Sequence, residues 1–114
     1  MLPGHARMRR SEDFRRTVRD GVRAGRRTLV VHAATSAPTG PLVGFVVSKT
    51  VGSAVRRNRV RRRLRHLARV HLPTLSTETM VVVRALPPAS TAGDALGTDL
   101  DAAWLSALAK LARR

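Results

Sequence analysis

The segment over residues 54–69 constrains the fold more than any other, because it holds eight arginines, no acid and regularly spaced apolar residues. At helical spacing, one side of this segment carries Val60, Leu64, Leu67, Ala68 and His71. The opposite side carries Asn58, Arg62, Arg65 and Arg69. The spacing predicts a helix over roughly 54–71 with its apolar side on a core. Guanidinium and amide groups in one stripe favour a phosphate-rich partner, which indicates nucleic acid.

The charge of the whole chain agrees with this interpretation. The 114 residues include 22 Lys and Arg against 7 acids, a net charge of +15, and 20 of the 22 bases are arginine. No acid occurs between Gly21 and Thr77, so the middle of the chain is a continuous positive field. Such a field attracts polyanions, of which nucleic acid is the first candidate and an anionic membrane surface the second. The membrane surface is the weaker candidate, because the apolar side of the basic helix is needed for the core.

Composition also excludes several classes of protein. The chain has no cysteine, which rules out disulfides, thiolate nucleophiles and Cys-ligated zinc. Its few acids are dispersed and its four histidines lack metal-ligand spacing, so no two-metal nuclease site is predicted. No apolar run approaches the ~18 residues of a membrane span, and residues 1–10 lack the apolar core of a signal peptide. We therefore expect a single cytoplasmic domain over residues 1–114.

The remaining pattern predicts an α+β domain. Residues 1–10 are an irregular basic arm, a helix follows from Ser11 to Gly21, and residues 86–97 are a linker before an amphipathic C-terminal helix. Strands are predicted over 28–33, 42–48 and 80–85, and the first two are expected to form a hairpin through a turn at 35–41. This order of elements indicates a two-layer sandwich, with helices on a small sheet.

Residues 49–65, KTVGSAVRRNRVRRRLR, resemble the signature of the bacterial ribonuclease P protein subunit. The positions that fit this signature are Val51, Ala54, Arg57, Asn58, Arg61, Arg62 and Arg65. The opening Met1-Leu2-Pro3, the basic arm, the segment 11–14 and the strand directly before the signature also resemble that family. The resemblance covers roughly residues 1–86, and the C-terminal helix resembles the family only in its placement.

The resemblance implies both a fold and a function. It implies a small mixed sheet with about three helices, in which the arginine-rich helix makes a left-handed crossover between parallel strands, against the common hand. It implies a large catalytic RNA as partner, which supplies the active site and, with the substrate, binds most of the Mg²⁺. By this resemblance, the protein would bind this RNA and the 5′ leader of precursor tRNA, and it would promote endonucleolytic removal of the leader. It would carry no catalytic residue of its own, and it would require no protein partner.

Two alternatives remain open from the residues themselves. A non-catalytic RNA-binding protein, such as a ribosomal protein, would share a basic, arginine-rich α/β domain. A DNA-binding protein is less favoured, because the segment 49–53 is a strand-to-helix turn rather than part of a helix-turn-helix.

Individual residues can be assigned to candidate sites on this basis. The predicted RNA-binding residues are Lys49, Gly52, Arg56, Arg57, Asn58, Arg61, Arg62, Arg65 and Arg69, joined by Arg7, Arg9 and Arg10 of the basic arm. Gly52 either lets an anion approach the N-terminus of the helix or is a simple turn glycine.

The aromatic residues number only three, and the resemblance gives two of them a role. It implies that Phe14 and Phe45 line a cleft for the single-stranded leader, whose bases stack on aromatic rings. Phe14 as a core residue is the alternative, and Val18 stands where the family often has a second aromatic. Trp104 is predicted to lie in the core.

Overall fold

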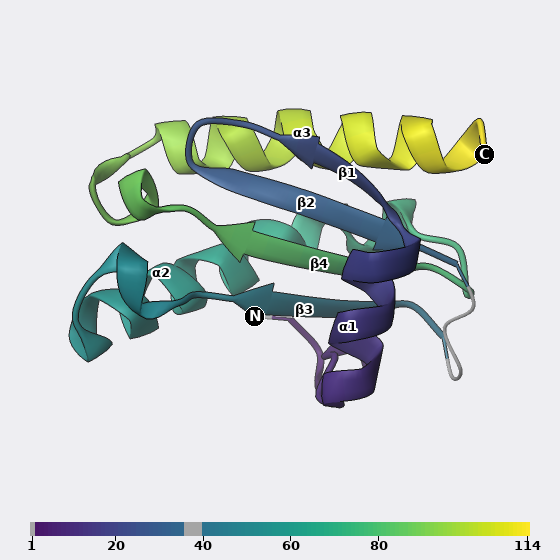
Figure 1. The fold of residues 1–114 in the computed structure, drawn as a ribbon, viewed down its shortest axis with the longest axis horizontal. Coiled ribbons are helices and arrows are strands. Elements are labelled where there is room, and N and C mark those ends of the chain that lie inside the picture. Colours follow the sequence, from purple (N-terminus) through teal and green to yellow (C-terminus); the bar gives the residue numbers. More distant parts are fainter. Residues whose placement is uncertain (1, 36–39) are drawn as a thin grey trace.

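The computed structural model describes residues 2–35 and 40–114, which form three α-helices and a four-stranded sheet (Figure 1). The helices are α1 (Ser11–Asp20), α2 (Ala54–Ala68) and α3 (Ala95–Ala112). The strands are β1 (Val22–Gly25), β2 (Leu29–Ala34), β3 (Leu42–Val46) and β4 (Met80–Ala85). Short 3₁₀ segments cover Gly4–Ala6, Lys49–Val51, Arg69–Thr74 and Pro87–Thr91. The predicted α+β class is confirmed.

The sheet is mixed, as expected. Its strand order is β1-β2-β4-β3, with β4 antiparallel to β2 and parallel to β3. In Figure 1, β3 and β4 both run to the left, β4 lies above β3, and α2, which connects them, passes behind the sheet. The crossover from β3 through α2 to β4 is therefore left-handed, which is the rare hand for a parallel pair.

The predicted hairpin between residues 28–33 and 42–48 is wrong. β4 lies between these two strands, and the turn proposed to join them falls partly on residues 36–39, outside the described residues. β2 instead forms its hairpin with β1, a strand of four residues that no apolar alternation marks in the sequence. As a consequence β3 is an edge strand. The basic arm runs beside part of that edge, where the Met8 N–H donates to the Val43 carbonyl at 2.9 Å.

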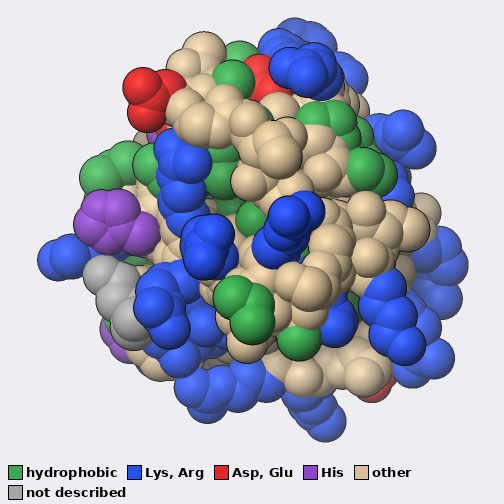
Figure 2. Space-filling model, turned by 90° about the vertical axis from the view of Figure 1, so that its left-hand side faces the viewer, with side chains coloured by type: hydrophobic (Ala, Val, Ile, Leu, Met, Phe, Trp, Pro, Cys, Tyr) green, Lys and Arg blue, Asp and Glu red, His purple; other side chains and the backbone are tan. Residues whose placement is uncertain are grey.

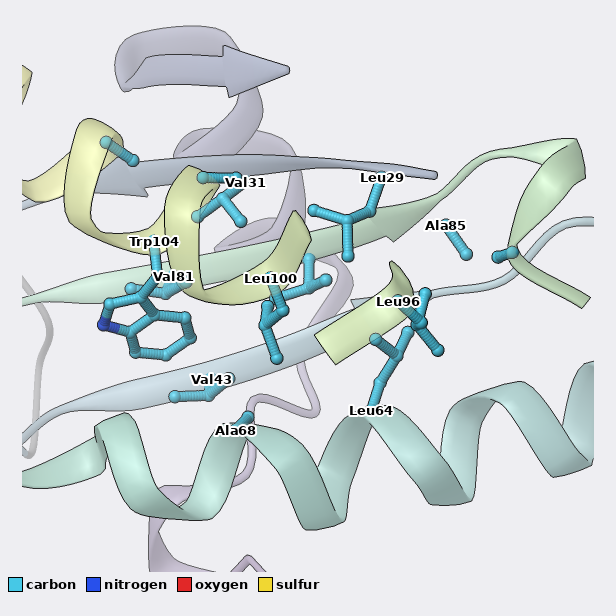
Figure 3. Packing of buried hydrophobic residues seen from close by; sticks show 14 of the residues in the cluster. Leu29, Val31, Val43, Leu64, Ala68, Val81, Ala85, Leu96, Leu100 and Trp104 are labelled. Carbon is cyan, nitrogen blue, oxygen red and sulfur yellow. The ribbon is translucent and has the colours of Figure 1, made fainter. Parts of the chain in front are cut away.

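The main core lies between the sheet and the two long helices. In Figure 3, Leu64 and Ala68 of α2 point up toward the strands, and Leu100 and Trp104 of α3 lie in front of the strands. All four side chains are fully buried. The predicted apolar side of α2 is thus confirmed, except that α2 ends at Ala68 and His71 lies in the following 3₁₀ segment. Trp104 is in the core, as predicted. It donates from Nε1 to Thr74 Oγ1 at 3.0 Å, and its ring stacks on that of His71 with the centroids 5.2 Å apart.

The other face of the sheet carries a smaller apolar cluster. It contains Met8, Ala34, Leu42, Met80 and Val82, with Phe14 and Val46 packed against it. α1 crosses the strands on this face near one end of the sheet (Figure 1). The face is therefore only partly covered, and the arm and α1 bring their basic residues close to β3.

The predicted linker over 86–97 contains regular structure. Pro87 and Pro88 begin a 3₁₀ segment, because the fixed φ of proline suits the first turn of a helix. Ala89 in this segment is buried, and α3 begins at Ala95. This connection is consequently part of the packed domain.

Candidate RNA interface

α2 presents basic residues on every side that does not face the core. Ser53 caps the helix, since its Oγ accepts a hydrogen bond from the Arg56 N–H at 3.3 Å. Asn58, Arg62 and Arg69 are exposed on the outer side, as predicted. Arg65 departs from that stripe, because it is half-buried and turns toward the edge of the sheet.

A cleft lies where the basic arm, α1 and α2 meet the edge strand, and we call it the β3 cleft. It has a volume of about 220 Å³ and is lined by Arg7, Met8, Arg9, Phe14, Val43, Gly44, Phe45 and Arg65. Phe14 approaches from the α1 side of the sheet, whereas Phe45 packs against the core on the α2 side. The two predicted aromatics, two arginines of the arm and one arginine of α2 are therefore brought together around one strand edge.

Gly44 explains how the Phe14 ring lies so close to β3. A Cβ built on Gly44 would be 2.5 Å from both Cε1 and Cζ of Phe14, so only glycine leaves room for the ring. Phe14 itself is half-buried. One part of the ring packs in the small apolar cluster and the other lines the β3 cleft. The core interpretation of Phe14 is therefore confirmed in part, and its role in binding the leader stays a prediction. The sequence did not single out Gly44, although a glycine within a β-branched run is a signal for a close approach.

The charges around the cleft repel one another. Burial lowers the pKa of Arg65, and the neighbouring cations Arg7 and Arg61 lower it further. Arg61 donates from Nη1 to Asn58 Oδ1 at 3.1 Å, which ties the asparagine to this flank. Among the described residues, the Arg57 Nε is buried without a hydrogen-bond partner. An anion bound in the cleft would relieve the repulsion between Arg65 and its neighbouring cations.

The turn before α2 distinguishes between the two interpretations of Gly52. Gly52 has φ +149° and its N–H donates to the Lys49 carbonyl at 3.2 Å, so that N–H is not available to a ligand. This geometry favours the simple turn interpretation of Gly52. Lys49, Arg56 and Arg10 are exposed and lie outside the cleft lining.

A second hollow lies on another side of α2. It has a volume of about 450 Å³ and is lined by Arg59, Arg62, Arg63 and His66, of which only Arg62 was predicted as a site residue. Arg63 Nη2 is 3.9 Å from Asp94 Oδ1. Figure 2 shows how basic side chains spread over the end of the molecule where α2 begins. In the sequence, the spacing of Arg59 and Arg63, one helical turn apart, could have indicated that this side of α2 is also basic.

Replacing Gly44 by alanine is expected to destabilise the protein by about 1–3 kcal/mol and to weaken binding of single-stranded RNA, because the added methyl displaces the Phe14 ring. Urea unfolding and titration with a labelled oligoribonucleotide measure the two effects. Gly25→Ala is the matched control, since its Cβ would meet nothing closer than Val30 Cγ2 at 3.9 Å. Equal behaviour of the two variants would contradict the close approach of Phe14.

The described residues contain no group of three His, Cys, Asp or Glu that could hold a metal ion. Within the same ranges, no helix is long and apolar enough to cross a membrane. What the molecule does present is an aromatic-lined cleft inside an arginine-rich surface, on a domain with net charge +15. Fold and surface together define a basic α+β protein of the RNA-binding class.

The comparisons with known proteins identify the family. The family model described as Ribonuclease P matches residues 2–108. A ribonuclease P protein component from a Nocardioides species is 51% identical over 105 residues, covering 89% of this chain and 90% of that protein. One from Streptomyces avermitilis is 53% identical over 113 residues, covering 90% and 92%. The chain belongs to the family of ribonuclease P protein components.

Solved structures agree with this assignment. The RNase P protein of Staphylococcus aureus has a TM-score of 0.78 at 26% identity, and the match covers 93% of this chain and 96% of that one. The RNase P protein of Thermotoga maritima has a TM-score of 0.68 at 22% identity, with 95% and 96% covered, and shares the fold. The fold of this chain, in which the crossover is left-handed and β3 is an edge strand, is thus similar to that of solved RNase P proteins.

Proposed function

We propose that this ribonuclease P component leaves catalysis to an RNA subunit and contributes affinity for the 5′ leader of precursor tRNA, in the cytoplasm. As a ribonuclease P protein component, the chain acts in the maturation of tRNA 5′ ends, with the ribonuclease P RNA as its partner. One observation carries the finer proposal, namely the convergence of Phe14, Phe45 and Arg65 on one cleft at the edge of β3.

The chemistry of the cleft suits a single-stranded nucleic acid. Exposed parts of aromatic rings stack on bases of any sequence, and a surrounding positive groove follows the phosphates. Phe14 offers the stacking surface, while Arg65, Arg7 and Arg9 supply the charge within the same cleft. The bases of a duplex are paired and stacked inside it, so they could not stack on the aromatic rings of this cleft. The single-stranded leader is therefore the part of the substrate that fits best.

The reacting groups are assigned to the RNA for a chemical reason. Hydrolysis of a phosphodiester by metal ions needs carboxylates or similar ligands placed together. Residues 2–35 and 40–114 offer no such cluster, so this part of the chain does not fit a Mg²⁺ site. We place the Mg²⁺ ions on the RNA subunit and the substrate, and the protein holds the leader beside them.

A reconstitution tests this proposal. The protein is combined with a bacterial ribonuclease P RNA at low magnesium, and cleavage of precursor tRNA is followed. Restored 5′ cleavage, with no cleavage by the protein alone, supports the proposal. Binding of RNA without any support of cleavage would favour the alternative, a non-catalytic RNA-binding protein. Cleavage by the protein without RNA would overturn the assignment of catalysis.

Phe14→Ala is expected to lower the affinity for precursor tRNA about 10-fold, because loss of one base stack costs about 1–3 kcal/mol. The affinity for mature tRNA, which has no leader, is expected to change little. Leu105→Ala on α3, 61% exposed in the wild type and outside the cleft lining, serves as the control. Circular dichroism checks that both variants are folded. Equal losses of affinity for the two RNAs would assign Phe14 to the core alone.

A further inference from the structure

The basic arm is anchored in both apolar clusters of the protein. Leu2 is 1% exposed and belongs to the main core, and Ala6 of the same core is fully buried. Met8 is also buried and belongs to the smaller cluster on the α1 side of the sheet. Terminal residues of a domain are usually poorly ordered unless something holds them down. The burial of Leu2 therefore calls for an explanation.

The arm crosses the edge of the sheet between these anchors. Arg7 forms a parallel β-bridge with Val43 of β3, and the Met8 N–H donates to the Val43 carbonyl at 2.9 Å. In Figure 1 the chain starts beside β3 and leads into α1. Leu2 thus lies on one face of the sheet and Met8 on the other, with Arg7 at the crossing point. We call residues 2–8 the arm clasp.

Hydrogen bonds within the arm clasp give it a fixed shape. A 3₁₀ turn covers Gly4–Ala6, in which the Ala6 N–H donates to the Pro3 carbonyl at 3.1 Å. Pro3 precedes this turn with φ −59°, close to the value that its ring imposes. The Arg7 Nε donates to the Leu2 carbonyl at 3.3 Å. A displacement of Leu2 would therefore also move the guanidinium group of Arg7.

The position of Arg7 is electrostatically unfavourable in the free protein. Arg7 and Arg65 line the same β3 cleft. Burial lowers the pKa of Arg65, and the charge of Arg7 lowers it further, which shows that the two cations repel each other. The burial of Leu2 and Met8 opposes this repulsion, which would otherwise push the arm away from the edge. The arm clasp thus brings two guanidinium groups together before a phosphate binds, which lowers the cost of binding it.

We propose that Leu2 is a positioning residue for substrate binding, because its side chain in the main core holds Arg7 in the β3 cleft, where Arg7 meets a phosphate of the leader. Leu2 is buried and lies outside the cleft lining, so it acts through Arg7 and not by contact with the substrate. This inference rests on the proposed function, since it assumes that the leader enters the cleft. The affinity for precursor tRNA then depends on a leucine that the RNA does not touch.

A double-mutant cycle tests whether Leu2 acts through Arg7. Arg7→Ala is expected to lower the affinity for precursor tRNA about 10-fold, as the loss of one hydrogen-bonded charge does. Leu2→Ala should have a similar effect. The double variant should lose about 10-fold in total and not about 100-fold, because the second change removes no further contact. The salt dependence of log affinity should fall by ~0.7 in all three variants. Losses that multiply, or an unchanged affinity of Leu2→Ala, would overturn the proposal.

Two control variants separate positioning from stability. Leu100→Ala truncates an equally buried leucine of α3 outside the cleft lining, so it should destabilise the protein and leave the affinity unchanged where the protein is folded. Leu2→Ile conserves the volume of the side chain and should stay within about twofold of the wild-type affinity. Urea unfolding gives the stability of each variant. Equal losses of affinity in Leu2→Ala and Leu100→Ala would assign the effect to stability and contradict the positioning role.

Amide hydrogen exchange in the full chain follows the arm directly. The Met8 N–H is hydrogen-bonded to β3 in the wild type, so its exchange should be slow. In Leu2→Ala we expect this amide to exchange about 10-fold faster relative to the amides of β4, because the arm opens locally while the sheet stays folded. A Met8 rate that changes only in parallel with β4 would exclude local opening and sink the proposal. Leu2→Val, which removes less of the side chain, replaces Leu2→Ala if that variant does not fold.

Kinetics of the reconstituted holoenzyme distinguish this inference from the proposed function. With a bacterial ribonuclease P RNA at low magnesium, Leu2→Ala should raise the KM for precursor tRNA about 10-fold and leave kcat unchanged, because it removes a contact made equally to substrate and transition state. A lower kcat at unchanged KM would overturn the positioning role. If Phe14→Ala and Arg7→Ala weaken binding of the precursor and Leu2→Ala does not, only this inference fails. If none of the three variants weakens it, the proposed function fails as well.

Discussion

Changing Arg61 and Arg65 together to alanine is expected to lower the affinity for precursor tRNA by about 100-fold, the largest effect on binding that we predict. Hydrogen bonds to charged groups contribute about 1.5–3 kcal/mol each, and both arginines belong to the repelling cluster at the β3 cleft. The slope of log affinity against log salt should also fall by about 1.4, because each phosphate contact on a single strand contributes ~0.7.

A matched pair on the same helix makes this result specific. Arg59→Ala/Arg63→Ala removes the same charge at the same spacing, but from the flank that lines the second hollow. Fluorescence anisotropy with precursor and mature tRNA over a salt series compares the two double variants. We expect the Arg61/Arg65 pair to affect the precursor much more than the mature tRNA. If the two double variants lose equal affinity, binding depends on the charge of α2 as a whole and not on the cleft.

Trp104→Ala is expected to lower the free energy of unfolding by about 3–5 kcal/mol, the largest effect on stability. The side chain is fully buried between α3 and the sheet, where Figure 3 shows it beside Val81 and Leu100. Its loss leaves a large void, unpairs Thr74 Oγ1 from the indole N–H and removes the ring stacked on His71. Domains of this size are stable by only about 5–15 kcal/mol, so the variant approaches the limit of folding.

Urea unfolding followed by circular dichroism measures this change. Leu105→Ala is the control, because the neighbouring leucine is 61% exposed and its truncation should stay within about 0.5 kcal/mol. Trp104→Phe retains most of the packing and loses the indole N–H, so an intermediate value is expected. A loss below about 1 kcal/mol for Trp104→Ala would mean that α3 contributes little to the core.

The local sequence pattern was sufficient to predict which face of a helix is buried, where that face depends only on the helix's own residues. The 3.6-residue period of α2 separated Val60 and Leu64 from Asn58 and Arg62 without knowledge of any neighbour. The same holds for Trp104, whose helical spacing with Leu100 indicated the core. Arg65 sits at the boundary between the outer side and the flank of α2, and only the position of β3 decided that it turns into the cleft.

The sequence pattern could not predict which distant strands pair with one another. Two neighbouring apolar strands suggested a hairpin, yet α2 carries the chain back so that β4 fits between β2 and β3. Strand order depends on which faces the helices cover, and no residue in the strands encodes that choice locally. The closeness of Phe14 to Gly44 depends on the same arrangement of the strands.

By itself, the sequence determined that this chain is a basic α+β protein with an amphipathic arginine-rich helix, because charge and periodicity are properties of short segments. The resemblance carried by residues 49–65 pointed to the ribonuclease P family, to which the chain belongs. The tertiary structure decided that β3 is an edge strand and that the arm, α1 and α2 meet there in one cleft. It did so because the burial of apolar faces on both sides of the sheet, summed over the whole chain, sets which strands lie side by side.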